Sequence, residues 1–142
     1  MILLVLLSSC ALPRPGVELT VAGTAIPGSR EGSYCQSGAC SGVCADSIPL
    51  SAPLTRVDAS APLVFEFSTG REVNEIHAGI FPGDDLHGQP AAYAIDLAGG
   101  DRRHSLTTQL SGHYYIAVLI RWSRFTDSGD ASRAFRVDIV PR

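Results

Sequence analysis

Gly-His-Tyr-Tyr-Ile-Ala-Val-Leu-Ile-Arg-Trp, at Gly112–Trp122, is the stretch that decides the fold. Successive side chains of a β-strand point to opposite faces, and both alternate sets carry apolar residues here. We therefore predict a long central strand covered on both faces. The segment Ala134–Val140 alternates apolar with charged residues, which is typical of a strand with one solvated face. The two segments predict a hairpin against which the rest of the chain packs.

The remaining sequence predicts short strands separated by turns, because Gly and Pro recur at strand-length intervals and no segment has a 3.6-residue period. We predict an all-β fold, a single immunoglobulin-like β-sandwich of seven or eight strands. The other predicted strands are Val17–Val21, Leu54–Asp58, Leu63–Phe67, Val73–Phe81, Ala92–Leu97 and His104–Leu110. The predicted core holds Phe65, Phe67, Tyr114, Ile116, Val118, Ile120, Phe135, Val137 and Ile139.

The turn Ser111-Gly112-His113-Tyr114 resembles the corner before the penultimate strand of immunoglobulin-like domains. In those domains a tyrosine hydroxyl donates a hydrogen bond back to the backbone of the corner. The resemblance implies this bond for Tyr114. The other interpretation is a tyrosine that only packs its ring.

Composition bounds the class of protein. A chain of 142 residues, 45% hydrophobic and 18% charged, suffices for one domain with a core. Its net charge is -3 and its charges are mixed along the chain. Because nucleic-acid binding requires a basic patch, we predict no nucleic-acid partner.

The N-terminus carries an apolar run, Ile2–Leu7, followed by Ser8-Ser9-Cys10. This pattern resembles the lipobox of bacterial lipoproteins, which implies that the peptide is cut before Cys10 and that the Cys10 thiol is lipidated. The run is short and no basic residue precedes it, so we expect the natural start to lie upstream of Met1. The other interpretation is an apolar N-terminus with Cys10 in a disulfide.

These features divide the chain into a signal peptide at residues 1–9, a lipidated cysteine and tether at residues 10–16, and the sandwich at residues 17–142. The predicted location is outside the cytoplasm, anchored to a bacterial membrane and facing the periplasm or the cell exterior. The membrane, reached through the lipid anchor, is then the first predicted partner.

Three further cysteines, Cys35, Cys40 and Cys44, lie within ten residues. Their spacing fits no common zinc pattern, and disulfides persist in exported proteins. Closing a loop from Cys35 to Cys44 causes less strain than either shorter closure. We therefore predict a Cys35–Cys44 bridge that ties this loop to the first sheet, and a free Cys40.

Gly32-Ser33-Tyr34-Cys35 and Cys44-Ala45-Asp46, together with Gly112–Val140, resemble a pattern of uncharacterised exported bacterial proteins. Gln36 stands where that family usually has Trp, and Cys40 is additional. The resemblance implies a fold and a compartment, but no activity.

Catalytic motifs are missing from the sequence. It contains no G-x-S-x-G, no H-E-x-x-H and no phosphate-binding Gly-rich loop, and its four histidines lack metal-type spacing. His87 near Asp84 and Asp85 is interpreted as part of a solvated polar loop rather than a cation site. We predict no enzyme activity, no metal and no cofactor.

Binding by loops is the predicted function, because loops on a rigid scaffold commonly carry recognition. The two longest polar loops are predicted at Pro82–Pro90 and Ser123–Ser132. Within the second, Arg124 and Phe125 are the expected contacts. Trp122 is either an exposed contact or a core residue, and its position on the face of Ile116–Ile120 favours the core. We thus predict a non-catalytic cell-envelope lipoprotein with a protein partner in the envelope.

Three alternatives remain open. The Gly-x-Tyr strand, Arg121-Trp122 and the Phe-x-Val-x-Ile end resemble the C-terminal hairpin of chagasin-like cysteine-protease inhibitors, although the Pro between Arg and Trp is absent. The others are a small cell-envelope hydrolase and a purely structural envelope component. A deep pocket holding perturbed histidines would favour the hydrolase, and a flat aromatic loop patch would favour the binder.

Overall fold

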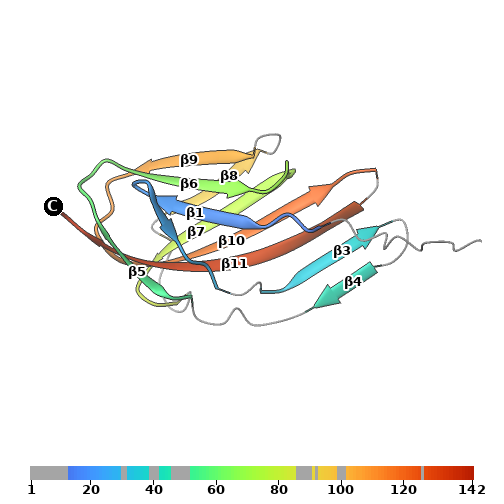
Figure 1. Ribbon diagram of the computed structural model, residues 1–142, viewed down its shortest axis with the longest axis horizontal. Coiled ribbons are helices and arrows are strands. Elements are labelled where there is room, and N and C mark those ends of the chain that lie inside the picture. Colours follow the sequence, from blue (N-terminus) through green and yellow to red (C-terminus); the bar gives the residue numbers. More distant parts are fainter. Residues whose placement is uncertain are drawn as a thin grey trace, which may run out of the picture.

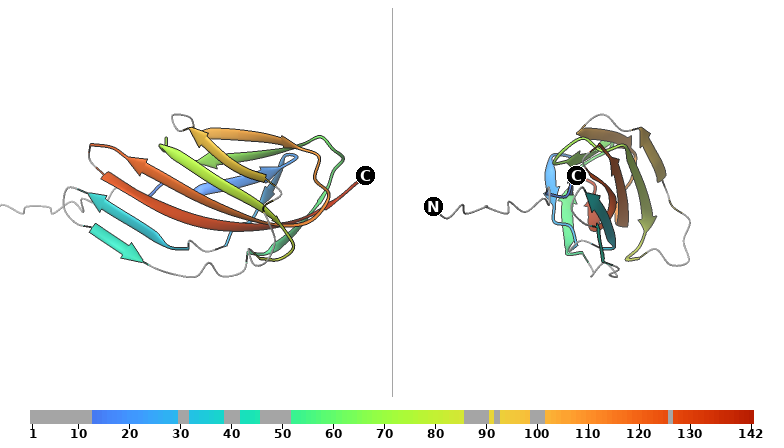
Figure 2. Two further views of the ribbon diagram at one scale, coloured as in Figure 1. Left: turned by 180° about the vertical axis from the view of Figure 1, so that it is seen from behind. Right: turned by 90° about the vertical axis from the view of Figure 1, so that its right-hand side faces the viewer.

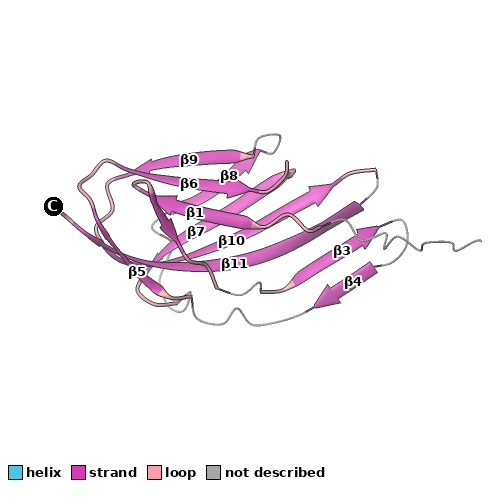
Figure 3. Ribbon diagram, in the orientation of Figure 1, coloured by secondary structure: helices cyan, strands magenta, loops and turns pink. Residues whose placement is uncertain are grey.

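The computed structural model describes residues 13–29, 32–38, 42–45, 52–85, 91, 93–98, 102–125 and 127–142. The described residues form strands and no helix, so the all-β prediction is confirmed (Figures 1 and 3). The strands are β1 (Val17–Val21), β2 (Thr24–Ile26), β3 (Tyr34–Gly38), β4 (Gly42–Ala45), β5 (Leu54–Asp58), β6 (Leu63–Thr69), β7 (Glu75–Pro82), β8 (Tyr93–Ala98), β9 (Arg103–Thr108), β10 (Gly112–Ser123) and β11 (Asp127–Val140).

The strands form two sheets packed face to face (Figure 2). The smaller sheet has the order β2-β1-β6-β9, and the larger has the order β4-β3-β11-β10-β7-β8. In addition, β5 pairs in parallel with the C-terminal part of β11. The chain changes sheet five times: between β2 and β3, β5 and β6, β6 and β7, β8 and β9, and β9 and β10. The last three crossings are those of an immunoglobulin-like sandwich, as predicted.

The core lies between the sheets because inward positions alternate with outward ones along each strand. Eight of the nine predicted core residues are buried, and the ninth, Tyr114, is half-buried against them. The side chain of Trp122 is also in the core, at 2% exposure. The strand face inferred from the alternation is therefore confirmed.

The corner before β10 has the expected tyrosine bond. The hydroxyl of Tyr114 donates to the carbonyl oxygen of Ser111 at 3.0 Å. Gly112 lies between them with a φ of 100°, a backbone conformation that favours glycine. The bond resolves the choice between the two interpretations of Tyr114.

The sequence predicted too few strands and placed one loop wrongly. The short strands β2, β3 and β4 were not expected, and β11 begins at Asp127, so Ser123–Ser132 is not a loop. The physical reason is that β10 pairs with β11 through backbone hydrogen bonds as far as Ser123, and the backbone of polar residues can form these bonds as well as that of apolar ones. Gly129 pairs with Trp122, and a Cβ at Gly129 would overlap the indole and the Cys35 carbonyl.

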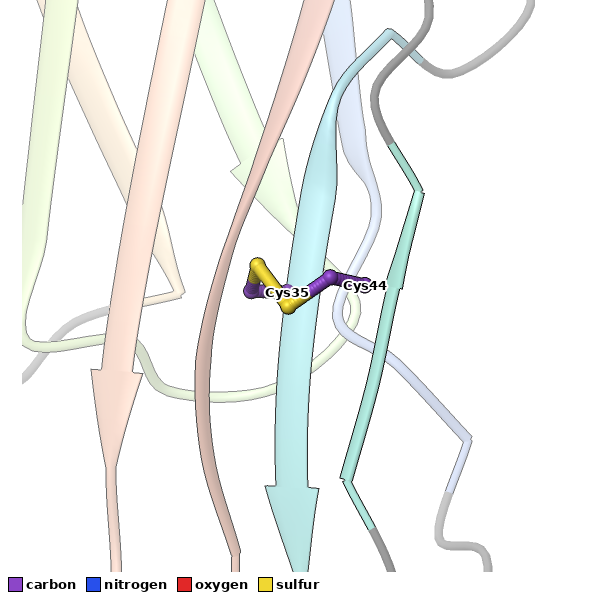
Figure 4. Close-up of a disulfide and its surroundings, with 2 residues drawn as sticks. All are labelled: Cys35 and Cys44. Carbon is purple, nitrogen blue, oxygen red and sulfur yellow. A yellow bond between two sulfur atoms is a disulfide. The ribbon is translucent and has the colours of Figure 1, made fainter.

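The predicted disulfide joins Cys35 to Cys44 (Figure 4). These residues lie opposite one another on β3 and β4, with 4.1 Å between their Cα atoms. The bridge therefore closes a hairpin at the edge of the larger sheet, and the expectation that it ties a loop to the first sheet is wrong. Cys10, Cys40 and the predicted signal peptide lie outside the described residues.

Candidate binding site at the tip of the β10–β11 hairpin

The β10–β11 hairpin ends at the same end of the sandwich as the β6–β7 loop. The backbone N–H of Asn74 in that loop donates to the carbonyl of Arg121 at 2.8 Å. The first strand begins there too, since Val17 pairs with Thr69, the last residue of β6. We call this the tip end; it lies at the right of Figure 1, opposite the labelled C-terminus.

Phe125 is the most exposed large apolar residue among those described. Its relative exposure is 106%, whereas Val43, Leu54 and Val64 are between 44% and 54% exposed. A lone apolar residue at a surface is common, but a fully solvated phenyl ring is a large apolar area left without packing. Phe125 is thus the described side chain that gains most apolar burial from contact with another surface.

Beneath the tip, Arg71, Asp127 and Trp122 form a cluster that we call the tip brace. Asp127 is 4% exposed and accepts hydrogen bonds from Nη1 of Arg71 at 3.3 Å, from Nη2 of Arg71, and from Nε1 of Trp122 at 2.9 Å. The hydrogen bond from Arg71, and next that from Trp122, outweigh burial and lower the pKa of Asp127 below its ordinary value. A carboxylate held this way fixes the first residue of β11.

The turn itself is closed by further bonds. The backbone N–H of Arg124 donates to the carbonyl of Asp127 at 2.8 Å. Nη2 of Arg124 lies 3.1 Å from a carboxylate oxygen of Glu72 in the neighbouring loop. A cavity of about 400 Å³ lies here, lined by Glu72, Val73, Asn74, Ser123, Arg124 and Phe125. The predicted contacts Arg124 and Phe125 therefore share one surface.

Trp122 does not share that surface. Its ring is buried and its N–H is bonded to Asp127, so it supports the tip from below and makes no outside contact. The sequence interpretation missed Arg71 and Asp127 as its partners. One signal was available: a buried indole needs a hydrogen-bond acceptor, and Asp127 is the first carboxylate that follows Trp122 in the chain.

A second concave region lies on the outer face of the larger sheet. Four small residues, Ala94, Gly79, Ala117 and Ala134, occupy successive register positions across β8, β7, β10 and β11. Bulkier side chains flank this row and form an apolar groove of about 460 Å³. The flanking apolar residues are Phe81, Tyr115 and Leu119.

His77 lies at the wall of this groove. Its Nδ1 is 2.6 Å from Asp96, and its Nε2 is 3.0 Å from Glu75. These two hydrogen bonds, that with Asp96 first, raise the pKa of His77 above its ordinary value. A pocket with a perturbed histidine is the feature that would favour a hydrolase. However, both ring nitrogens are bonded to carboxylates, so the ring has no free lone pair with which to act as a general base.

The loop after β7 was the other predicted binding loop. Asp84 pairs there with the guanidinium of Arg136, whose side chain is 21% exposed. This pairing agrees with a polar loop whose charges are matched by the protein. His87 and the rest of Pro82–Pro90 beyond Asp85 lie outside the described residues. Among the residues that the structure describes, no group of three or more His, Cys, Asp or Glu is arranged to hold a metal ion.

No helix in the described part of the chain is long and apolar enough to cross a membrane. Comparison with known proteins found no matching family model, no matching curated protein and no matching solved structure.

Proposed function

We propose that this protein is an exported, lipid-anchored β-sandwich that acts by binding rather than by catalysis, and that it binds through the tip of the β10–β11 hairpin. One observation carries the proposal: Phe125 is fully exposed on a turn held by the buried tip brace. A contact residue on a rigid support loses little conformational freedom on binding, which favours affinity.

The location outside the cytoplasm draws on two features. The Cys35–Cys44 disulfide is compatible with an oxidising compartment. The Leu7-Ser8-Ser9-Cys10 sequence supplies the proposed site of lipid attachment. Acyl chains on Cys10 would hold the sandwich at a membrane surface without a spanning segment.

Binding through the tip is better supported than protease inhibition or hydrolysis. A chagasin-like inhibitor gains no support, because Trp122, which carries part of that resemblance, lies in the core. A hydrolase gains little from the outer groove, because both ring nitrogens of His77 are bonded to carboxylates.

The test is photocrosslinking in intact cell envelopes. A photoreactive phenylalanine analogue replaces Phe125 in one variant of the full chain and Val64 in a control. Val64 is 44% exposed and receives a backbone hydrogen bond from Ala22, in the turn at the end of the sandwich opposite the tip. We expect a covalent adduct with an envelope component at position 125 and none at position 64. Equal adducts, no adduct at 125, or turnover of an envelope substrate by the purified protein would contradict the proposal.

A further inference from the structure

The N-terminal segment and the hairpin tip are at the same end of the sandwich. The strand β1 starts at Val17, beside Thr69, and the loop that follows Thr69 reaches the tip through the Arg71–Asp127 pair. The last strand also runs away from the tip, and it finishes at the opposite end of the sandwich, where Val140 pairs with Asp58. A chain tethered through its N-terminus therefore presents the tip end toward its attachment point (Figure 1).

The tether is short. Six residues, Ala11–Gly16, separate Cys10 from the first strand. Pro15 is buried and Arg14 lies over the ring of Tyr34, so three residues separate Cys10 from the packed part of the chain. At about 3.3–3.6 Å per residue, three residues span at most about 10 Å. An anchor at Cys10 would thus hold the tip end close to the lipid headgroups.

The side chains at the tip end suit such a surface. Phe125 is fully exposed, and Arg124 is next to it. Arg102 and Arg103 are exposed at the same end, where they adjoin the end of β6. Arg121 and Arg124 lie beside the β6–β7 loop and pair there with Glu75 and Glu72. Aromatic rings favour the membrane interface, and arginines favour anionic headgroups.

At the opposite end, Asp58 pairs with Arg56 and Asp84 with Arg136. The exposed large apolar residue described there, Val64, is not aromatic. The tether and the aromatic ring at position 125 therefore favour the same orientation.

We infer that the tip of the β10–β11 hairpin docks on the anchoring membrane, with Phe125 at the boundary between headgroups and acyl chains and with Arg102 and Arg103 facing lipid phosphates. This inference rests on the proposed lipid anchor at Cys10, and it names anionic lipid as the partner of the proposed binding tip. The tip brace holds Phe125 in place, so docking requires no refolding of the hairpin.

The experiment uses the full chain purified from bacterial membranes and reconstituted in vesicles of phosphatidylethanolamine and phosphatidylglycerol. A Phe125→Trp variant adds an indole at the tip, and the native Trp122 is buried and supplies a constant background. Lipids brominated near the headgroup quench indoles that enter the interface. We expect a blue shift and an emission loss of about twofold for the added indole, as befits an interfacial tryptophan. Wild type and Val64→Trp are the controls, and both should show little quenching.

Mass spectrometry of the same samples distinguishes a failure of the docking inference from a failure of the proposed lipid anchor. A lipidated Cys10 with an unquenched indole at position 125 would overturn the docking inference and leave the anchor in place. A protein adduct at position 125 in the photocrosslinking experiment, without quenching, would assign the tip to a protein partner instead. An unmodified Cys10 with residues 1–9 still attached would overturn both the anchor and the inference built on it.

Discussion

Replacing Asp127 with Asn tests whether the tip brace stabilises the fold. The substitution nearly keeps the side-chain volume but removes the negative charge. An amide also replaces one of the two oxygens that accept hydrogen bonds from Arg71 and Trp122. The guanidinium of Arg71, whose side chain is only 19% exposed, then loses its carboxylate partner. We therefore expect Asp127→Asn to destabilise the folded state.

The magnitude follows from the bonds lost. A hydrogen bond to a charged group contributes about 1.5–3 kcal/mol, and breaking a buried ion pair costs about 3–5 kcal/mol. Arg71 retains some access to water, which recovers part of this loss. We expect the free energy of unfolding to fall by about 2–4 kcal/mol, and at about 4 °C per kcal/mol the melting temperature falls by roughly 8–16 °C.

The dependence on pH gives a second check. The pKa of Asp127 is lower in the folded state, so its ionisation stabilises the fold above the ordinary aspartate pKa, and this contribution is lost as the pH falls through the folded-state pKa. The stability difference between wild type and Asp127→Asn should be constant from about pH 5 to 8 and shrink below about pH 4.

Urea and thermal unfolding, followed by circular dichroism at several pH values, measures both effects. Asp130→Asn, in the same strand, is the matched control and should change stability by less than about 0.5 kcal/mol. A loss below about 1 kcal/mol for Asp127→Asn, or a difference that does not shrink in acid, would refute the reasoning.

Two further predictions concern the core and the outer groove. Val118→Asp should prevent folding, because burying an unpaired carboxylate at a position 2% exposed costs more free energy than the stability of a typical domain. Val64→Asp, at an exposed position, is the control and should still fold. A Val118→Asp protein that is folded by circular dichroism would show that the strand face is misassigned. His77 should titrate by NMR above its ordinary pKa of 6.5, and Asp96→Asn should lower that pKa. Because the pKa of His77 is raised in the folded state, its stabilisation of the fold is complete below about pH 6.5 and is lost as the pH rises through the folded-state pKa. An unshifted titration of His77 would contradict its bonding to Asp96 and Glu75.

The sequence predicts the two-sheet core well, because the strands that build it alternate strictly. The inward set Ile116, Val118 and Ile120 continues to Trp122 without a break, which places the tryptophan in the core. The disulfide pairing was also predictable, since one closure causes less strain than the others. Each of these inferences depends only on residues close together in the chain.

The strands that the sequence missed depend on partners far away in the chain. Neither β3 nor β4 shows a regular alternation of apolar and polar residues, and β3 is ordered by pairing with residues 127–131. The N-terminal half of β11 has turn-forming residues, yet β10 imposes the strand by hydrogen bonding along its full length. Tertiary context overrides local propensity in both places.

The candidate site was half predictable. Arg124 and Phe125 could be chosen by residue type at a polar turn, but the tip brace joins Arg71 to Asp127 across two loops. The outer groove could not be inferred at all, because the row of small residues exists only once the registers of four strands are known. Such features arise from the register between strands, which the pattern within one strand does not fix by itself.

The pairing of β11 has a consequence for the order of folding. On the side away from β10, this last strand pairs with β3 along its first residues and with β5 along its final ones. The β3–β4 hairpin and β5 therefore cannot join the larger sheet until the residues of β11 have been synthesised, and such long-range pairing slows folding.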